Sequence, residues 1–385
     1  MVERDQMQRL SGGVTGLCGS LVFVDALHVV YNGRRLLWFA GCDYFRMSQH
    51  PEVRAAIRNC LEQHGLSVSA SRVTTGDHRL YSVLEREIAR YAGTEAAVLA
   101  PTGYVANLMA AQALAGKVTH AFIDERAHWS LRDASVLLGC PLTTFRHRDA
   151  SDLRSKLERL PSQSKPVVLT DGVFAKDGSI APLAEELGLV SRRGWLLVDD
   201  AHGFGVVGNL GRGSAEWAGI KSGRLIQTVS LSKAVGVFGG AVLTTQLMEK
   251  SIRSRSTVYA GSTPMPLPLV AGALVSMKFL RMDRFRRQRL ASNTKIVKSA
   301  LRAAGILVPD TPVPIVSVVA VGGMNDIRRF HDHLVRHAIY PSVARYPGTR
   351  ECGRFRFVIS SEHRAEHLER LIEALTSFAG LAGGV

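Results

Sequence analysis

The strongest constraint on the fold is a regular alternation of short apolar runs with amphipathic segments through the middle of the chain. The apolar runs have the length and aliphatic composition of buried strands, and they lie at 96–100, 121–124, 142–145, 167–170, 196–199, 225–229 and 240–244. Helical patterns fill gaps between them, including 107–115, 151–160 and 183–193. This alternation predicts an α/β fold with a mostly parallel seven-stranded sheet flanked by helices.

The segments before the sheet predict an N-terminal arm and two helices. Residues 1–40 form the arm, with a hairpin of strands at 21–30 and 35–39 around Asn32-Gly33, a pair typical of tight turns. Pro51 marks the first turn of a helix over 51–63. A second helix is expected over 80–91, after an irregular loop at 65–76.

The character of the chain changes again at the proline-rich stretch 264–268. One long helix is expected over 269–303, followed by a small α+β portion with strands near 313–321 and 354–359 and a helix at 364–378. We therefore predict three parts: an N-terminal arm at 1–40, a large domain at 41–268, and a linking helix with a small C-terminal domain at 269–385.

Composition excludes several classes of protein. The 385 residues contain no apolar run of membrane-spanning length, and the polar start of the chain is not a secretory signal. The five cysteines are odd in number and lack CxxC spacing, which favours reduced thiols in a cytoplasmic protein without a metal site.

The net charge of +15 allows three interpretations. A solvated surface is favoured, because the arginines are spread along the chain apart from one cluster at 281–289. Attraction to a polyanionic substrate carrier, either CoA or an acidic acyl carrier protein, is the second. Nucleic-acid binding is the third, and no motif for it is found, so we expect no nucleic-acid partner.

Three polar residues follow two of the predicted strands. Lys233 comes after the run at 225–229, and Asp199 and His202 end or follow the run at 196–199. In an open α/β sheet, functional groups gather at the carboxyl ends of the strands. A lysine, a buried carboxylate and a histidine together suit a pyridoxal-phosphate site: Lys233 forms a Schiff base, Asp199 pairs with the pyridinium nitrogen, and His202 reaches the phenolic oxygen.

Further residues suit the phosphate and the ring of that cofactor. Gly103 and Tyr104 lie between a predicted strand and an alanine-rich helix, where backbone N–H groups bind phosphate. Ser230 precedes Lys233 and could add a hydroxyl donor. His128 follows another strand end and could stack on the ring, although a surface histidine is the alternative.

Several longer stretches carry a resemblance to a known family. They are Thr170-Asp-Gly-Val-Phe-Ala-Lys-Asp-Gly178 with Ala181-Pro-Leu-Ala184, Val198-Asp-Asp-Ala-His-Gly203, Gly211-Arg-Gly213 and Ser230-Leu-Ser-Lys233. With them the chain resembles the α-oxoamine synthase family of fold-type I pyridoxal-phosphate enzymes over about residues 36–375. The resemblance implies the cofactor roles given above, with Lys233, Asp199, His202 and His128 as the catalytic residues.

The resemblance also implies a reaction and partners. The reaction is a decarboxylative condensation of an amino acid with an acyl thioester, delivered by CoA or a carrier protein, to an α-amino ketone. Arg356 would bind the amino-acid carboxylate. A homodimer with shared active sites is implied, in which Ser262 and Thr263 reach the neighbouring phosphate site.

Three positions depart from the family pattern and leave the substrates open. Asp43 stands in the loop where an asparagine that helps hold the substrate carboxylate is usual, so it would be paired, for instance with Arg46, or would face a cationic group. Ala175 replaces a common serine, and Tyr81 replaces a histidine common near the amino-acid site. By their positions, Asp43 and Tyr81 are candidate substrate-binding residues together with Arg356. An alternative is other pyridoxal-phosphate chemistry on the same scaffold: transamination, aldol cleavage or simple decarboxylation.

Overall fold

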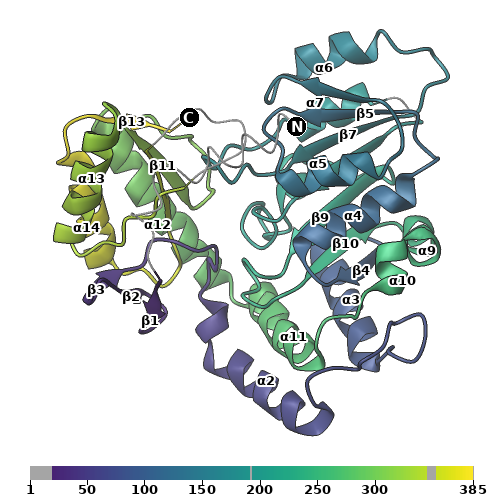
Figure 1. Ribbon diagram of the computed structural model, residues 1–385, viewed down its shortest axis with the longest axis horizontal. Helices are drawn as coiled ribbons and strands as arrows, with labels where there is room; N and C mark the ends of the chain where they lie inside the picture. The colour runs from purple at the N-terminus through teal and green to yellow at the C-terminus, as the bar shows by residue number, and fades with distance from the viewer. Residues whose placement is uncertain (1–19, 191–192, 345–352, 385) are drawn as a thin grey trace.

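The computed structural model describes residues 20–190, 193–344 and 353–384. Two lobes lie side by side, joined by long helices below the gap between them (Figure 1). Cys18 and Cys352 and the first half of the predicted arm fall outside the described residues. Within the described residues, no helix is long and apolar enough to cross a membrane.

The larger lobe is built on a seven-stranded sheet of order β4-β10-β9-β8-β7-β5-β6. Strands β9, β8, β7, β5 and β6 run parallel to one another, whereas β10 is antiparallel to both β9 and β4. The predicted mostly parallel sheet is therefore confirmed. The strands span β4 (Ala96–Ala100), β5 (His120–Asp124), β6 (Leu142–Phe145), β7 (Pro166–Asp171), β8 (Trp195–Asp199), β9 (Leu225–Ser230) and β10 (Gly240–Thr244).

Helices cover both faces of this sheet. Because side chains alternate along a strand, Val98 and Ala100 of β4 pack into the core under α4, while Ala97 and Leu99 pack into the opposite core with α3 and α11. The helices of the large lobe are α2 (Pro51–His64), α3 (Arg79–Ala92), α4 (Gly103–Leu114), α5 (Trp129–Val136), α6 (Ala150–Leu157), α7 (Leu183–Leu189), α8 (Ser214–Trp217), α9 (Gln246–Arg255), α10 (Thr257–Gly261) and α11 (Leu267–Met282), with a short 3-10 turn η1 (Met47–Gln49).

The prediction of one long helix over 269–303 is wrong. The structure has two helices, α11 and α12 (Arg284–Ala303), separated at Asp283. The Asp283 carboxylate accepts a hydrogen bond from the Arg286 backbone N–H at 2.9 Å, so it caps the start of α12. The apolar α11 packs against the large lobe, and α12 leads into the small lobe (Figure 1).

The small lobe combines a C-terminal sheet with the predicted hairpin. Strands β11 (Ile315–Ala320), β12 (Arg354–Val358) and β13 (Leu381–Gly383) form an antiparallel sheet packed by α13 (Met324–Arg336) and α14 (Ala365–Thr376). The hairpin is confirmed as β2 (His28–Tyr31) and β3 (Arg34–Leu37), with β1 (Val22–Phe23) beside it. Asn32 and Gly33 both have positive φ, as this tight turn requires. The three domain limits themselves stay a prediction.

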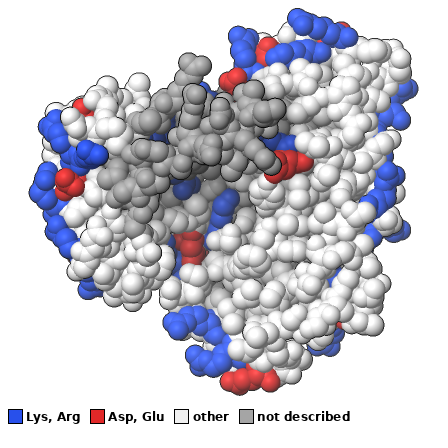
Figure 2. Space-filling model, in the orientation of Figure 1, with Lys and Arg blue, Asp and Glu red and all other residues white. Residues whose placement is uncertain are grey.

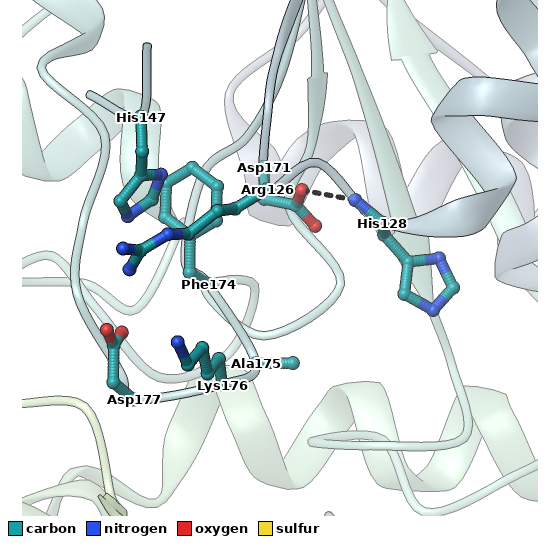
Figure 3. Close-up of a pocket in the computed structure, with 8 residues that line it drawn as sticks. All are labelled: Arg126, His128, His147, Asp171, Phe174, Ala175, Lys176 and Asp177. Carbon is teal, nitrogen blue, oxygen red and sulfur yellow. Dashed lines mark hydrogen bonds between the residues drawn. The ribbon is translucent and has the colours of Figure 1, made fainter. Parts of the chain in front are cut away.

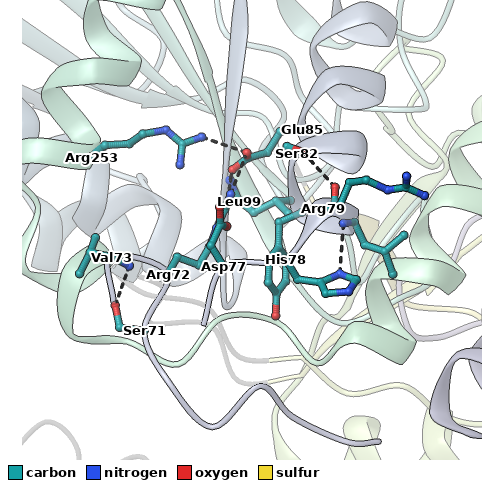
Figure 4. A network of polar contacts seen from close by, with 12 residues as sticks. Ser71, Arg72, Val73, Asp77, His78, Arg79, Ser82, Glu85, Leu99 and Arg253 are labelled. Atoms are coloured by element: carbon teal, nitrogen blue, oxygen red, sulfur yellow. Dashed lines mark hydrogen bonds and ion pairs between the residues drawn. The ribbon is translucent and has the colours of Figure 1, made fainter. Parts of the chain in front are cut away.

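The irregular loop before α3 is anchored by a buried ion-pair network (Figure 4). Glu85 of α3 accepts hydrogen bonds from Arg72 at 2.6 and 3.2 Å, from Arg253 of α9 at 2.9 Å, and from the Leu99 backbone N–H at 3.0 Å. One carboxylate thereby links the loop, α3, α9 and the edge strand β4.

Candidate active site

The carboxyl ends of β7, β8 and β9 bring the main candidate residues together. These strands are adjacent and parallel, with Asp171 opposite Asp199 and Asp199 opposite Thr228 in the register. Lys233 follows the end of β9 within the same edge of the sheet. Because β8 and β9 are adjacent and parallel, the predicted lysine and carboxylate lie at the same edge of the sheet, and the charges of Asp199 and Asp171 both raise the pKa of Lys233 against the effect of burial.

Asp199 is buried at the end of β8 and held by hydrogen bonds to both oxygens. Asn107 Nδ2 donates to Oδ2 at 2.7 Å, Ser130 Oγ donates to the same oxygen at 3.3 Å, and the Ala201 backbone N–H donates to Oδ1 at 3.1 Å. Thr228 Oγ1 in turn donates to Asn107 Oδ1 at 2.6 Å. The carboxylate is thus fixed in orientation before any ligand arrives.

The sequence analysis missed Asn107, Ser130 and Thr228. The available signal was an isolated asparagine in the otherwise apolar, alanine-rich segment that forms α4, since a buried amide requires partners.

Two further buried acids, Asp171 and Asp200, lie next to Asp199, and their pKa values are raised. Burial and the neighbouring Asp199 carboxylate raise the pKa of Asp171 well above its ordinary value, while the His128 backbone N–H donates to Asp171 Oδ2 at 2.8 Å. Burial raises the pKa of Asp200 to about 7. Protonation of these neighbours limits the negative charge crowded around Asp199.

His202 is buried, and its surroundings favour the uncharged imidazole. Burial, followed by the charges of Lys233 and Arg356, lowers the pKa of His202 well below its ordinary value. Its Nδ1 is hydrogen-bonded to the Tyr44 hydroxyl at 2.6 Å. Tyr44 comes from the loop before η1, so this loop orients the histidine, a contact that the sequence did not predict.

Lys233 has the properties of a nucleophilic amine. Burial lowers the pKa of Lys233, and the Arg356 charge lowers it further, whereas Cys42, Asp199 and Asp171 oppose the shift. A larger fraction of the amine is therefore unprotonated near neutral pH than for an ordinary lysine.

His128 lies at the start of α5, beside the same carboxylates. Its Nδ1 is hydrogen-bonded to Ser130 Oγ at 2.7 Å, and its ring meets that of Tyr104 edge to face. Burial lowers the pKa of His128. A neutral imidazole held in this way is suited to stacking on a flat cationic ring.

The expected phosphate cradle is assembled from α4 and β9. Helix α4 begins at Gly103, earlier than predicted, and the Thr102 hydroxyl caps it by accepting from the Val105 backbone N–H at 3.1 Å. A Cβ atom on Gly103 would lie 2.9 Å from Ser230 Cβ, so only glycine allows the helix N-terminus to approach Ser230 this closely.

The remaining predicted cofactor residues lie nearer the surface. Tyr104 is partly exposed, and its hydroxyl donates to Asp133 of α5. Ser262 and Thr263 follow α10, which packs on α4. Their contribution to a neighbouring phosphate site stays a prediction.

The three predicted substrate residues differ in their surroundings. Arg356 of β12 reaches across to the large lobe, where its Nε donates to the Ala175 carbonyl at 2.7 Å. Tyr81 is buried, with its hydroxyl donating to the Met265 carbonyl at 2.8 Å. Asp43 accepts from the backbone N–H groups of Met47 and Ser48, both at 2.9 Å. These contacts favour a structural role for Asp43 over the predicted contact with substrate.

A cavity opens beside His128 and Asp171 (Figure 3). His147 and Phe174 pack edge to face on one side of it, and Ala175, Lys176 and Asp177 form the opposite rim. Arg126 completes its basic lining with His147 and Lys176. The cavity thus adjoins the site that Lys233 and Asp199 define, and its lining carries Arg126 and Lys176 together with the carboxyl groups of Asp171 and Asp177.

Fold and site together define a pyridoxal-phosphate enzyme of the α/β transferase type. The model of the aminotransferase class I and II family matches residues 35–375, and the chain belongs to this family.

The similar proteins narrow the class. An 8-amino-7-oxononanoate synthase of Thioalkalivibrio sulfidiphilus is 33% identical over 90% of this chain and 89% of its own length. That of Methylococcus capsulatus is 35% identical over 90% of each chain. The serine palmitoyltransferase structure of Sphingomonas wittichii superposes with a TM-score of 0.88 at 28% identity, covering 97% of this chain and 95% of that one. The predicted α-oxoamine synthase family is confirmed.

The residues present fit the cofactor that this family uses. Similar serine palmitoyltransferase structures are described as holding pyridoxal phosphate, and the cofactor prediction is confirmed at that level. Within this chain, a fixed buried carboxylate, a depressed lysine pKa and a glycine-lined helix N-terminus coincide at one strand edge. Together they offer a cationic-ring partner, an amine and a phosphate cradle.

Proposed function

We propose that the protein joins an amino acid to an acyl thioester with loss of CO2, giving an α-amino ketone. The observation that carries this proposal is the fixed carboxylate of Asp199 at the end of β8 beside β9, the strand that Lys233 follows, in a chain of the α-oxoamine synthase family. Bound pyridoxal phosphate supplies an electron-withdrawing ring that stabilises negative charge at the substrate α-carbon.

Each residue at the strand ends has a defined task in this proposal. Lys233 would hold the cofactor, and its amine, whose pKa burial lowers, would take the substrate α-proton. Asp199 keeps the ring nitrogen protonated, His202 holds the phenolic oxygen, and His128 covers the ring face. Gly103, Tyr104 and Ser230 hold the phosphate, with Ser262 and Thr263 contributed by a second subunit.

Arg356 is proposed to bind the amino-acid carboxylate. Its Nε donates to the Ala175 carbonyl, and its two terminal nitrogens donate to Cys42 Sγ, on the loop that also carries Tyr44. A planar guanidinium fixed in this way engages both oxygens of a carboxylate. Because Arg356 belongs to the small lobe, carboxylate binding would also draw the two lobes together.

The acyl thioester is proposed to enter through the cavity beside His128. Arg126 and Lys176 on its lining would attract an anionic carrier, either the phosphates of CoA or an acidic carrier protein, and Asp177 lies on the same lining. Figure 2 shows other basic side chains spread around the edges of both lobes, in keeping with a solvated surface as the main source of the high net charge.

A homodimer in the cytoplasm completes the proposal. Large apolar side chains are exposed on the described part of the chain, including Val73, Tyr104, Trp129 and Phe238. Such side chains suit burial by a second copy of the chain. The cytoplasmic location is proposed from the five cysteines of the sequence, whose odd number and spacing favour reduced thiols.

A mixed substrate panel tests the reaction. The cofactor-loaded protein is incubated with glycine, alanine and serine and a series of acyl-CoAs, while CO2, free thiol and product mass are followed. Equal release of CO2 and thiol with an amino-ketone mass supports the proposal. Keto acid without thiol release would establish the alternative, a transamination. Lys233→Ala should abolish turnover, whereas Lys156→Ala, at a partly exposed lysine of α6 that pairs with Asp152, should not.

A further inference from the structure

The loop at 41–48 presents a cysteine to the site rather than a carboxylate. Both carboxylate oxygens of Asp43 accept hydrogen bonds, one from the Met47 backbone N–H and one from that of Ser48. Arg46 adopts a left-handed conformation with φ 53° and donates to the Trp38 carbonyl at 3.0 Å. Both charged groups therefore stabilise the loop itself. The residue of this loop that meets Arg356 is Cys42.

Cys42 occupies the edge of Arg356 that a carboxylate would use. Its Sγ accepts from Nη1 at 3.6 Å and from Nη2 at 3.5 Å, so both terminal nitrogens point at one sulfur atom. The third donor, Nε, is held by the Ala175 carbonyl at 2.7 Å. An incoming carboxylate that takes two parallel hydrogen bonds from the terminal nitrogens must displace the sulfur.

The charged and hydrogen-bonding groups around Cys42 come from three parts of the fold. Arg356 faces it from β12, Lys233 from the segment after β9, and Tyr44 and Arg46 from its own loop. Burial raises the pKa of the Cys42 thiol, but the charges of Arg356 and Lys233, with hydrogen bonds from Arg356 and Tyr44, bring it below its ordinary value. The charges of Arg356 and Lys233 thus favour the thiolate of Cys42 more than in an ordinary cysteine.

We propose that Cys42 is a specificity-determining residue of the carboxylate site. When Cys42 is a neutral thiol, the substrate carboxylate replaces its sulfur at the terminal nitrogens of Arg356. As a thiolate it pairs with Arg356 and excludes the carboxylate. This inference rests on the proposed role of Arg356 in amino-acid binding. It requires that the KM of the carboxylate substrate, and not kcat, depends on the charge of Cys42.

Alkylation tests the geometry without any turnover. The cofactor-loaded protein is treated with iodoacetate or iodoacetamide, and the labelled cysteines are quantified by peptide mass spectrometry, with Cys140 as the internal reference. For each cysteine, labelling by the negatively charged iodoacetate is divided by labelling by the neutral iodoacetamide. This ratio should be at least about tenfold higher at Cys42 than at Cys140. Arg356→Gln should remove this preference. Equal preference at the two cysteines would overturn the proposal.

The pH dependence of KM tests the competition. In the wild type, the KM of the amino acid should rise as pH passes the pKa of Cys42, by up to about tenfold per pH unit, the slope of a single proton. Cys42→Ser should flatten this rise, and Cys42→Asp should give a high KM at all pH values above the pKa of the new carboxyl. Cys140→Ser is the matched control and should behave as the wild type. An unchanged slope in Cys42→Ser would overturn the proposal.

The two experiments separate the inference from the proposed function. Protection of Cys42 from iodoacetate by glycine, alanine or serine links the site to amino-acid binding. Iodoacetate preference without protection by any of them would retain the Cys42–Arg356 pair but remove the amino acid as its ligand, which contradicts both the competition proposed here and the proposed substrate.

Discussion

Asn107 joins Asp199 to Thr228 across the base of the site: its Nδ2 donates to Asp199 Oδ2 at 2.7 Å, and its Oδ1 accepts from Thr228 Oγ1 at 2.6 Å. The amide therefore ties α4, whose first residue forms part of the phosphate cradle, to the ends of β8 and β9. Both halves of the proposed cofactor site share this one side chain.

Asn107→Ala should weaken cofactor binding by about tenfold or more. The change removes the short hydrogen bond of the buried Thr228 hydroxyl, leaving only the longer one to the Val198 carbonyl, and frees the Asp199 carboxylate to move. We expect a loss of about 1–3 kcal/mol, of which 1.4 kcal/mol corresponds to tenfold in affinity. Titration of the cofactor-free protein with pyridoxal phosphate, followed by absorbance, measures the Kd. Asn293→Ala, which removes a part-buried asparagine from α12, is the control. Equal Kd values for all three proteins would contradict this role.

Glu85→Ala should destabilise the fold strongly. The side chains of Arg72 and Glu85 are only 6% and 7% exposed, so the substitution leaves a buried guanidinium without its main partner. Removing one member of a buried ion pair costs about 3–5 kcal/mol. Urea unfolding at fixed protein concentration gives the free energy. Glu249→Ala breaks a more exposed pair with Arg253 and should cost under about 1 kcal/mol. Similar losses in both variants would show that the Glu85 network adds nothing specific.

Glu186 should make the protein less stable as pH rises. Burial, and then the Asp124 charge, raise the pKa of Glu186 from 4.5 to about 8, and neither of its carboxyl oxygens has a hydrogen-bond partner among the described residues. The folded state therefore keeps a proton that the unfolded state has lost. Because the folded state binds more protons in this range, stability falls between the two pKa values.

Glu186→Gln should remove that dependence. The unfolding free energy of the wild type should decline relative to the variant by about 1.4 kcal/mol per pH unit at most, between about pH 5 and about pH 8. Asp200, whose pKa of about 7 acts in the same range, is present in both proteins and cancels in the difference. Parallel stability curves for the two proteins would rule out a buried protonated Glu186.

Much of the fold was predictable because its information is local. The runs at 96–100 and 240–244 appear as β4 and β10 with the predicted limits, since buried strands require continuous apolar sequence. Lys233 and Asp199 could be placed together because parallel strands deliver their ends to one edge. The break at Asp283 was missed although aspartate before a polar segment is a helix-start signal.

The missed parts of the site depend on contacts between distant segments. Cys42 meets Arg356 only because the loop before η1 and β12 are brought together between the lobes. Asp43 turned inward because two backbone N–H groups of the 3-10 turn η1 needed an acceptor. Neither relationship has a periodic pattern in the sequence.

The attachment of the cofactor to Lys233 is the central claim and has a direct measurement. Sodium borohydride fixes a cofactor carbonyl that has condensed with a lysine, and peptide mass spectrometry then locates the label. We predict one label per chain, on the peptide that contains Lys233. A label on Lys176, which lines the neighbouring cavity, or no label on any lysine of the cofactor-loaded protein would contradict it.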